Sequence, residues 1–291
     1  MGLSLKNNCK MEANAISLKV KRLSRKEVAE LGFYDFLGYI GAFNSPMIGG
    51  LKGTNRLLDS IDIQADPGFQ VLELGCASGY TSCMVAEKYG CQVTGIDLSE
   101  ILIRKARERA AKMGLNNVKF QVANVMEMPF DDETFDAVYG VAITALVPDK
   151  HRALQEYIRV TKPGGVIGTL DMFPNPQGSR EAAEKLDAAL KMVLGSDAAL
   201  LSLEEWRAEF AGLDLENKEL IENYQEVLES PRDRKASIKA YLKLIYHMLI
   251  NGPVRRTVMK VLGVRNAITV EEGEEYEDIG YLIFCGRKPL I

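Results

Sequence analysis

The chain lacks several features that would assign it to other protein classes. Its 291 residues contain no apolar run long enough to cross a bilayer, so no membrane span is expected. The N-terminus carries no apolar signal core, and we expect a cytoplasmic protein. The five cysteines are odd in number and form no C-x-x-C pair, as is typical of a reduced protein without a disulfide framework.

The chain also lacks a positive net charge, and it has only two histidines, which argues against two kinds of function. The net charge of −4 argues against a nucleic-acid partner, because such proteins usually need a basic surface. No cluster of residues has the spacing of metal ligands, so no metal is expected. Hydrophobic residues make up 47% and charged residues 26% of the chain, which is ordinary for a globular protein of one large domain, or a domain with a cap.

The most informative segment is 71–82, VLELGCASGYTS. A strand-like run leads into a turn with small residues at Gly75, Ala77 and Gly79, and a helical segment follows. Asp97 lies 22 residues after Gly75, at the end of a second strand-like run. A strand, a small-residue turn, a helix start and a distant carboxylate predict a nucleoside-binding βαβ unit, in which Asp97 accepts hydrogen bonds from a ribose diol.

The spacing of the small residues distinguishes between nucleosides. A dinucleotide fold requires G-x-G-x-x-G, and two of its three positions fail here, which disfavours a nicotinamide-dependent oxidoreductase. The pattern Glu73-x-Gly75-x-Ala77-x-Gly79 resembles instead the first motif of class I S-adenosylmethionine-dependent methyltransferases. Ala77 departs from that motif by one methyl group, so we expect tighter clearance to the cofactor and not a loss of binding.

Four later segments extend the resemblance over residues 68–172, and within the superfamily the chain is similar to the ubiquinone/menaquinone-biosynthesis and small-molecule branch. They are VTGIDLSE at 93–100, FQVANVMEMPF at 120–130, FDAVYGV at 135–141 and RVTKPGG at 159–165. The resemblance implies S-adenosylmethionine as cofactor, with S-adenosylhomocysteine as product. It also implies in-line methyl transfer to a small molecule or lipid-like metabolite. A protein that binds the cofactor without transferring methyl groups stays an alternative.

Strand and helix patterns alternate through the core, which favours a parallel sheet with helices on both faces. Strands are expected near 70–74, 92–96, 118–122, 135–140 and 166–172, and helices near 80–89, 99–113 and 150–161. The resemblance completes this as a three-layer Rossmann-like sandwich, with a mostly parallel seven-stranded sheet, an antiparallel last strand and helical cap segments. We expect an N-terminal helical lid at 1–66, a cofactor-binding core at 67–175, and a helical substrate cap with the final two strands at 176–291.

The resemblance assigns cofactor contacts to four turns that follow strands. The residues are Glu73, Gly75, Cys76, Ala77, Gly79, Tyr80, Thr81, Asp97, Leu98, Asn124, Val125, Gly140 and Val141. Asn124 stands where the family usually has an aspartate, and its side-chain oxygen can still accept from the adenine amino group. A turn-capping role is the alternative for Asn124.

Catalytic and substrate residues are less defined. The sulfonium methyl group is already activated, so the protein mainly positions and desolvates the reactants. Asp171, at the end of the fifth strand, is a candidate general base for an acceptor that carries a proton. Tyr34, Phe43 and Tyr139 are candidate aromatic contacts to the substrate or the sulfonium.

Residues 231–265 carry nine Lys/Arg against one acid, interleaved with apolar residues. Two interpretations stay open. The segment around 232–262 contacts an anionic membrane peripherally, or it is a lid whose charges are solvated and neutralised by the acidic run Glu271–Asp278. The patterns fit either a monomer or a homodimer.

Overall fold

The computed structural model describes residues 23–43, 48–181, 183–184, 187–188, 191, 199–224, 234–256, 258–259 and 279–290, with backbone alone for 33 and 234–241. Outside these ranges lie the first 22 residues and the acidic run Glu271–Asp278. None of the described helices is long and apolar enough to cross a membrane.

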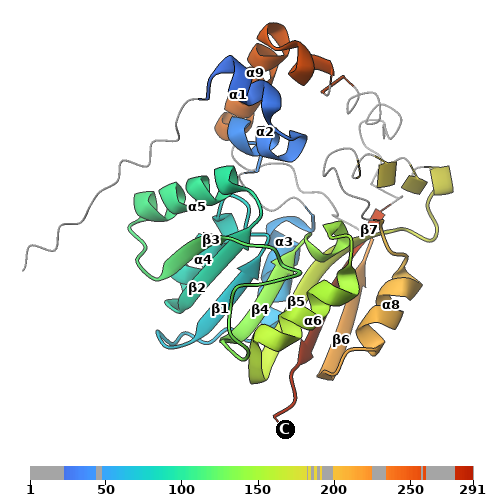
Figure 1. The fold of residues 1–291 in the computed structure, drawn as a ribbon. Helices are drawn as coiled ribbons and strands as arrows, with labels where there is room; N and C mark the ends of the chain where they lie inside the picture. Colours follow the sequence, from blue (N-terminus) through green and yellow to red (C-terminus); the bar gives the residue numbers. More distant parts are fainter. Residues whose placement is uncertain are drawn as a thin grey trace, which may run out of the picture.

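One sheet organises the described residues, and its seven strands run in the order β3-β2-β1-β4-β5-β7-β6 (Figure 1). The strands are β1 (Gln70–Leu74), β2 (Gln92–Asp97), β3 (Val118–Val122), β4 (Phe135–Val141), β5 (Thr161–Pro174), β6 (Glu216–Asn223) and β7 (Ile279–Arg287). The first five are parallel, and β7 runs antiparallel to both β5 and β6. This confirms the predicted Rossmann-like sandwich with an antiparallel last strand.

Helices cover both faces of the sheet. Figure 1 shows α6 (Lys150–Val160) and α8 (Leu203–Ala211) on one face. The opposite face carries α3 (Gly50–Ser60), α4 (Tyr80–Tyr89) and α5 (Glu100–Met113). β1 is central and buried on both sides, which explains its nearly continuous apolar sequence.

Local signals start and stop these helices where the sequence predicts. The Ser99 and Asp149 side chains accept hydrogen bonds from the first turns of α5 and α6, and Ser202 forms a capping box with Glu205 at the start of α8. Gly90 and Gly114 end α4 and α5 in the left-handed conformation. The helices α4, α5 and α6 therefore match the predicted ranges 80–89, 99–113 and 150–161 within one residue.

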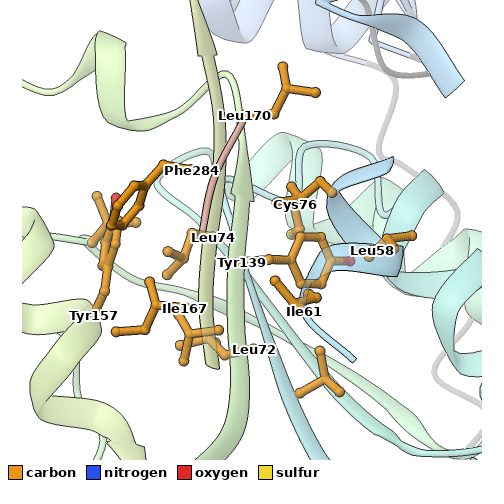
Figure 2. Packing of buried hydrophobic residues seen from close by; sticks show 14 of the residues in the cluster. Leu58, Ile61, Leu72, Leu74, Cys76, Tyr139, Tyr157, Ile167, Leu170 and Phe284 are labelled. Atoms are coloured by element: carbon orange, nitrogen blue, oxygen red, sulfur yellow. The ribbon is translucent and has the colours of Figure 1, made fainter. Parts of the chain in front are cut away.

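The core lies on both faces of the sheet, as Figure 2 shows. Leu72, Leu74 and Ile167 lie with Tyr157 on the α6 face, whereas Tyr139 lies with α3 on the other. On the α6 face, the rings of Phe210 and Phe284 stack with centroids 3.8 Å apart. This packing holds β7 and α8 against the parallel core.

A separate helical layer lies over the carboxyl edge of the parallel strands (Figure 1). It consists of α1 (Arg25–Glu30), α2 (Phe33–Ile40) and α9 (Arg234–Ile250), the last of which is inserted between β6 and β7. Val28, Phe36, Ile40, Val254 and Val258 form its own apolar cluster. Two segments far apart in sequence therefore make one structural layer.

Candidate functional site

The loop after β1 requires unusual backbone conformations. Gly75 and Gly79 have φ of 62° and 72°, and Ala77 between them has φ of 46°, although it carries a Cβ. A Cβ on Gly79 would lie 2.7 Å from both the Ala106 Cβ and the Phe120 ring. The loop therefore packs tightly under α5 while its backbone stays close to the carboxyl edge of the sheet.

Asp97, at the end of β2, holds this loop from the other side. Its Oδ2 accepts from the Ala77 N–H at 3.0 Å, and its Oδ1 accepts from the Ser99 N–H at 2.9 Å. Burial raises the pKa of the carboxyl to about 6, against the lowering effect of these two hydrogen bonds. Each carboxylate oxygen keeps a further lone pair, so two more donors such as a ribose diol can bind.

Glu73 lies beneath the loop, inside the α3 face of the sheet. It is 4% exposed and accepts from the Ser82 hydroxyl in the first turn of α4. Burial raises its pKa to about 7. Tyr139 is its register partner on β4, and burial together with the Glu73 charge raises the pKa of the tyrosine hydroxyl.

This position of Tyr139 differs from the one expected for a substrate contact. The ring is fully buried with Leu58 and Ile61 (Figure 2). Tyr139 therefore supports Glu73 and the core in this structure, and no face of its ring is open to a substrate.

The remaining loop residues pack around these carboxylates. Cys76 is buried, and burial raises the pKa of its thiol. Thr81 is buried in the first turn of α4, and the half-buried Tyr80 lies under the guanidinium of Arg109 at 5.2 Å from its ring centroid. Arg109 also donates to the Ser78 carbonyl oxygen at 3.0 Å. No sequence motif points to Arg109, because its contact depends on how α5 packs on the loop.

The segment after β3 forms a tight turn. The Asn124 side-chain oxygen accepts from the Met126 N–H at 3.0 Å, which is the turn-capping arrangement. A second lone pair on that oxygen remains for an adenine amino group. Val125 is buried, whereas Leu98, next to Asp97, is 69% exposed and offers an apolar surface to a ligand.

Ile143, which follows β4, lies at this site although no sequence motif points to it. A Cβ on Gly140 would lie 2.5 Å from Ile143, and one on Gly75 would lie 2.9 Å from the same side chain. Val141 is half-buried beside them. Ile143 therefore closes the space between the ends of β1 and β4, and both glycines are needed for it to fit.

The N-terminal helical layer reaches this edge through Tyr34 and Phe43. Their ring centroids lie 4.8 Å apart, and the Ser78 hydroxyl of the glycine loop donates to the Phe43 carbonyl oxygen. Burial and the nearby Asp97 charge raise the pKa of the Tyr34 hydroxyl. In the same layer, Asp35 accepts from the Ser99 hydroxyl. The predicted lid thus packs directly on the loop and on the turn after Asp97.

Asp171 lies one residue beyond the pairing of β5 with β4 and three residues before the end of β5, and its side chain enters the α6 layer. Its Oδ1 accepts from the Ala145 N–H at 2.9 Å, and the carboxyl is fully buried. Burial raises its pKa to about 7. The neighbouring Leu170 points the other way, toward Gly49 and Gly53 of the α3 side. The structure therefore does not bring Asp171 together with the residues around Asp97, and its role as a base stays a prediction.

The residues present fit a cofactor that combines a ribose, a base and a charged amino acid. Side chains at Gly75, Gly79 and Gly140 would clash with neighbouring residues, so glycine keeps the loops close to the sheet edge. Asp97 can accept hydrogen bonds from a diol, and Leu98 supplies an exposed apolar surface. In the described part of the chain, no group of three or more His, Cys, Asp and Glu could hold a metal ion.

Comparison with known proteins gives the same family. A methyltransferase-domain family model matches residues 65–230. The chain is 32% identical over 244 residues to the 27-O-demethylrifamycin SV methyltransferase of Amycolatopsis mediterranei, which covers 81% of this chain and 82% of that protein. It is 36% identical over 122 residues to the demethylmenaquinone methyltransferase of Listeria monocytogenes, 41% of this chain and 52% of that protein.

A solved structure agrees in fold. Phosphoethanolamine N-methyltransferase 2 of Haemonchus contortus, in complex with phosphomonomethylethanolamine and S-adenosylhomocysteine, superposes with a TM-score of 0.63 at 18% identity and covers 92% of this chain and 60% of that chain. With the family match and the rifamycin-related homologue, the chain belongs to the class I S-adenosylmethionine-dependent methyltransferases and is an enzyme of the small-molecule branch.

Proposed function

We propose that the enzyme methylates a small molecule or lipid-like metabolite at the carboxyl edge of β1, β2 and β4. The observation that carries the assignment of the site is the hydrogen bond from the Ala77 N–H to Asp97, which joins the glycine loop to the acid at the end of β2. The exposed Leu98 and the packing of Tyr34 and Phe43 over the loop support it. The rifamycin and demethylmenaquinone enzymes act on such metabolites, as their names state.

The roles of this chain's residues follow from their positions. Asp97 would accept from the ribose hydroxyls, the turn at Asn124 and Val125 would lie against the adenine, and Glu73 would balance the positive end of the methionine. S-adenosylmethionine, when bound, supplies a methyl group on a positively charged sulfur. Tyr34 and Phe43 would exclude water and form an aromatic wall for the acceptor.

The proposal also covers the partners and the compartment. The protein acts as a monomer or homodimer and has no nucleic-acid partner, and residues 232–262 are the segment through which a peripheral membrane contact would be made. A reducing compartment such as the cytoplasm suits Cys76, Cys83, Cys91 and Cys285, which are buried and free. The net charge of −4 for the whole chain supports the absence of a nucleic-acid partner.

Calorimetric titration with S-adenosylmethionine tests the site, with NAD as the negative control. We expect binding of the methyl donor that is lost in Asp97→Ala and retained in Asp131→Ala, since Asp131 is an exposed carboxylate on the loop before β4. Equal affinity of the two variants would refute the site. Screening of metabolite and lipid extracts for S-adenosylhomocysteine release would then identify the acceptor class.

A further inference from the structure

The helical layer contains a pocket that the methyl-transfer site does not use. It has a volume of about 170 Å³ and lies between α1, α2 and α9. Its lining includes Arg25, Tyr39, Lys243, Tyr246 and His247. Arg25 and Lys243 carry positively charged hydrogen-bond donors of the kind that bind a phosphate group, and the rings of Tyr39, Tyr246 and His247 complete the lining.

Two observations indicate that this pocket is built to hold a ligand. His247 is 7% exposed, and its buried Nδ1 has no hydrogen-bond partner. Its ring is fixed by edge contacts with Phe36, Tyr39 and Tyr246, at centroid distances of 5.8, 5.7 and 5.2 Å. A buried polar atom without a partner is costly, and a ligand oxygen or hydroxyl would satisfy it.

Arg25 and Lys243, the two cations of the pocket, form no ion pair with a carboxylate among the residues that the structure describes. Burial is the main cause that lowers the pKa of the Lys105 amine to about 8, and the nearby charge of Lys243 lowers it further. Lys105 itself donates to the Tyr39 carbonyl oxygen at 3.1 Å. Positive charge therefore continues from Lys243 of α9 to Lys105 of α5, beside the end of α2.

An apolar stripe lies next to the pocket on α9. It consists of Leu242, Ile245, Tyr246 and Leu249, which are spaced to share one helix face, and all four are exposed. Leu249 is the most open, at 75%. Residues 234–256 carry six Lys/Arg and no Asp/Glu in sequence. A contiguous exposed apolar face that includes the neighbouring exposed Lys243, in a segment whose sequence is rich in cations, marks an interaction surface.

We propose that this face docks on an anionic phospholipid bilayer, with a lipid phosphate in the α1–α2–α9 pocket and the stripe at the boundary between head groups and acyl chains. Charge decides against a second copy of the chain, because self-association through this face would bring its cations together. The delivery of a lipid-like acceptor from the bilayer rests on the proposed function, whereas the docking itself does not.

Co-sedimentation of the full chain with vesicles tests the docking. We expect binding to mixed phosphatidylcholine–phosphatidylglycerol vesicles and little binding to phosphatidylcholine alone. Lys243→Gln should weaken binding about fivefold, the effect of one cation near an anionic surface. Leu249→Ser should weaken it roughly tenfold through lost apolar burial. Leu290→Ser and Lys112→Gln change an exposed leucine and an exposed lysine outside the layer, and should bind as the parent protein does.

Three results would overturn the proposal. The first is equal binding of both vesicle types by every variant. The second is that inorganic phosphate fully displaces the protein from vesicles and also raises its thermal stability in a way that depends on Lys243. That result would make the pocket a site for a soluble phosphate. The third is a change of oligomeric state in Leu249→Ser without vesicle binding by the parent, which would make the stripe a dimer interface. Titration of the same variants with S-adenosylmethionine separates these results from a failure of the proposed function, since the docking face lies outside the loop that Asp97 holds.

Discussion

Replacement of Gly79 by alanine should destabilise the fold and weaken cofactor binding together. Gly79 has φ of 72°, a conformation that costs an alanine about 1–2 kcal/mol. The added Cβ would lie 2.7 Å from the Ala106 Cβ and 3.0 Å from its Cα, which cannot rotate away. Overpacking of this kind costs about 1–3 kcal/mol, so we expect a loss of about 2–5 kcal/mol in the free energy of unfolding.

The matched control is Ala77→Gly in the same loop. Ala77 already carries a Cβ at φ of 46°, and glycine would relieve about 1–2 kcal/mol of that strain. The greater freedom of glycine in the unfolded chain returns about 0.4–1 kcal/mol, so the net change should be a small gain. Denaturant unfolding gives the free energies, and titration with S-adenosylmethionine gives the affinities. If Gly79→Ala unfolds within about 0.5 kcal/mol of the parent protein, the tight packing inferred under α5 is wrong.

Three further predictions follow from the buried carboxyls and from the helical layer. Burial raises the pKa of Glu73 to about 7 and of Asp97 to about 6. The affinity for the positively charged cofactor should therefore fall as pH drops from about 8 to 5.5, and binding should release protons. A calorimetric affinity that does not change with pH would contradict this. The pKa of Asp171 is raised to about 7 in the folded state, so its ionisation destabilises the parent protein as pH rises toward 7. Asp171→Asn should therefore gain stability relative to the parent at about pH 8 compared with pH 5.5, as measured by denaturant unfolding. The buried Asn251 side chain donates to the Arg25 carbonyl oxygen at 3.1 Å. Asn251→Ala should therefore weaken the packing of α1 on α9 by about 1–2 kcal/mol in free energy. Limited proteolysis should then be faster in α1 and unchanged elsewhere.

The alternating core could be predicted because its signals are local. The Ser99 cap and the Gly114 stop bound α5 within fourteen residues, and a buried apolar run such as 70–74 is recognisable without its neighbours. β5 is longer than expected, since it begins at Thr161 and passes a register irregularity opposite Phe135 to Ala137 before reaching the predicted range. The proline and glycines at its start concealed that extension, because they are typical of a turn.

The site was only partly predictable, because its walls come from packing between distant segments. Asp97 follows from strand position and spacing, but the effect of its charge on Tyr34 depends on α2 folding back over the sheet. Ile143 has no motif at all, and its importance appears only when a Cβ is placed on Gly75 and on Gly140. Contacts of this kind depend on tertiary placement and leave no periodic or compositional trace.

The direction of Asp171 shows what strand alternation alone can and cannot decide. Tyr139 pairs with Gly168 across β4 and β5, so side chains of even-numbered β5 residues share its face and Asp171 must face α6. Alternation therefore already separates Asp171 from Glu73, which pairs with Tyr139 and faces α3. Strand-end position brings residues to the same edge of the sheet, but a shared chemical role also requires the same face or a loop that crosses between faces. Asp97 meets this requirement through the Ala77 N–H, whereas Asp171 is bound to the turn at Ala145 that carries Ile143 toward the site. We therefore expect substitutions of Asp171 to act on acceptor binding through that turn, with a larger change in KM than in kcat.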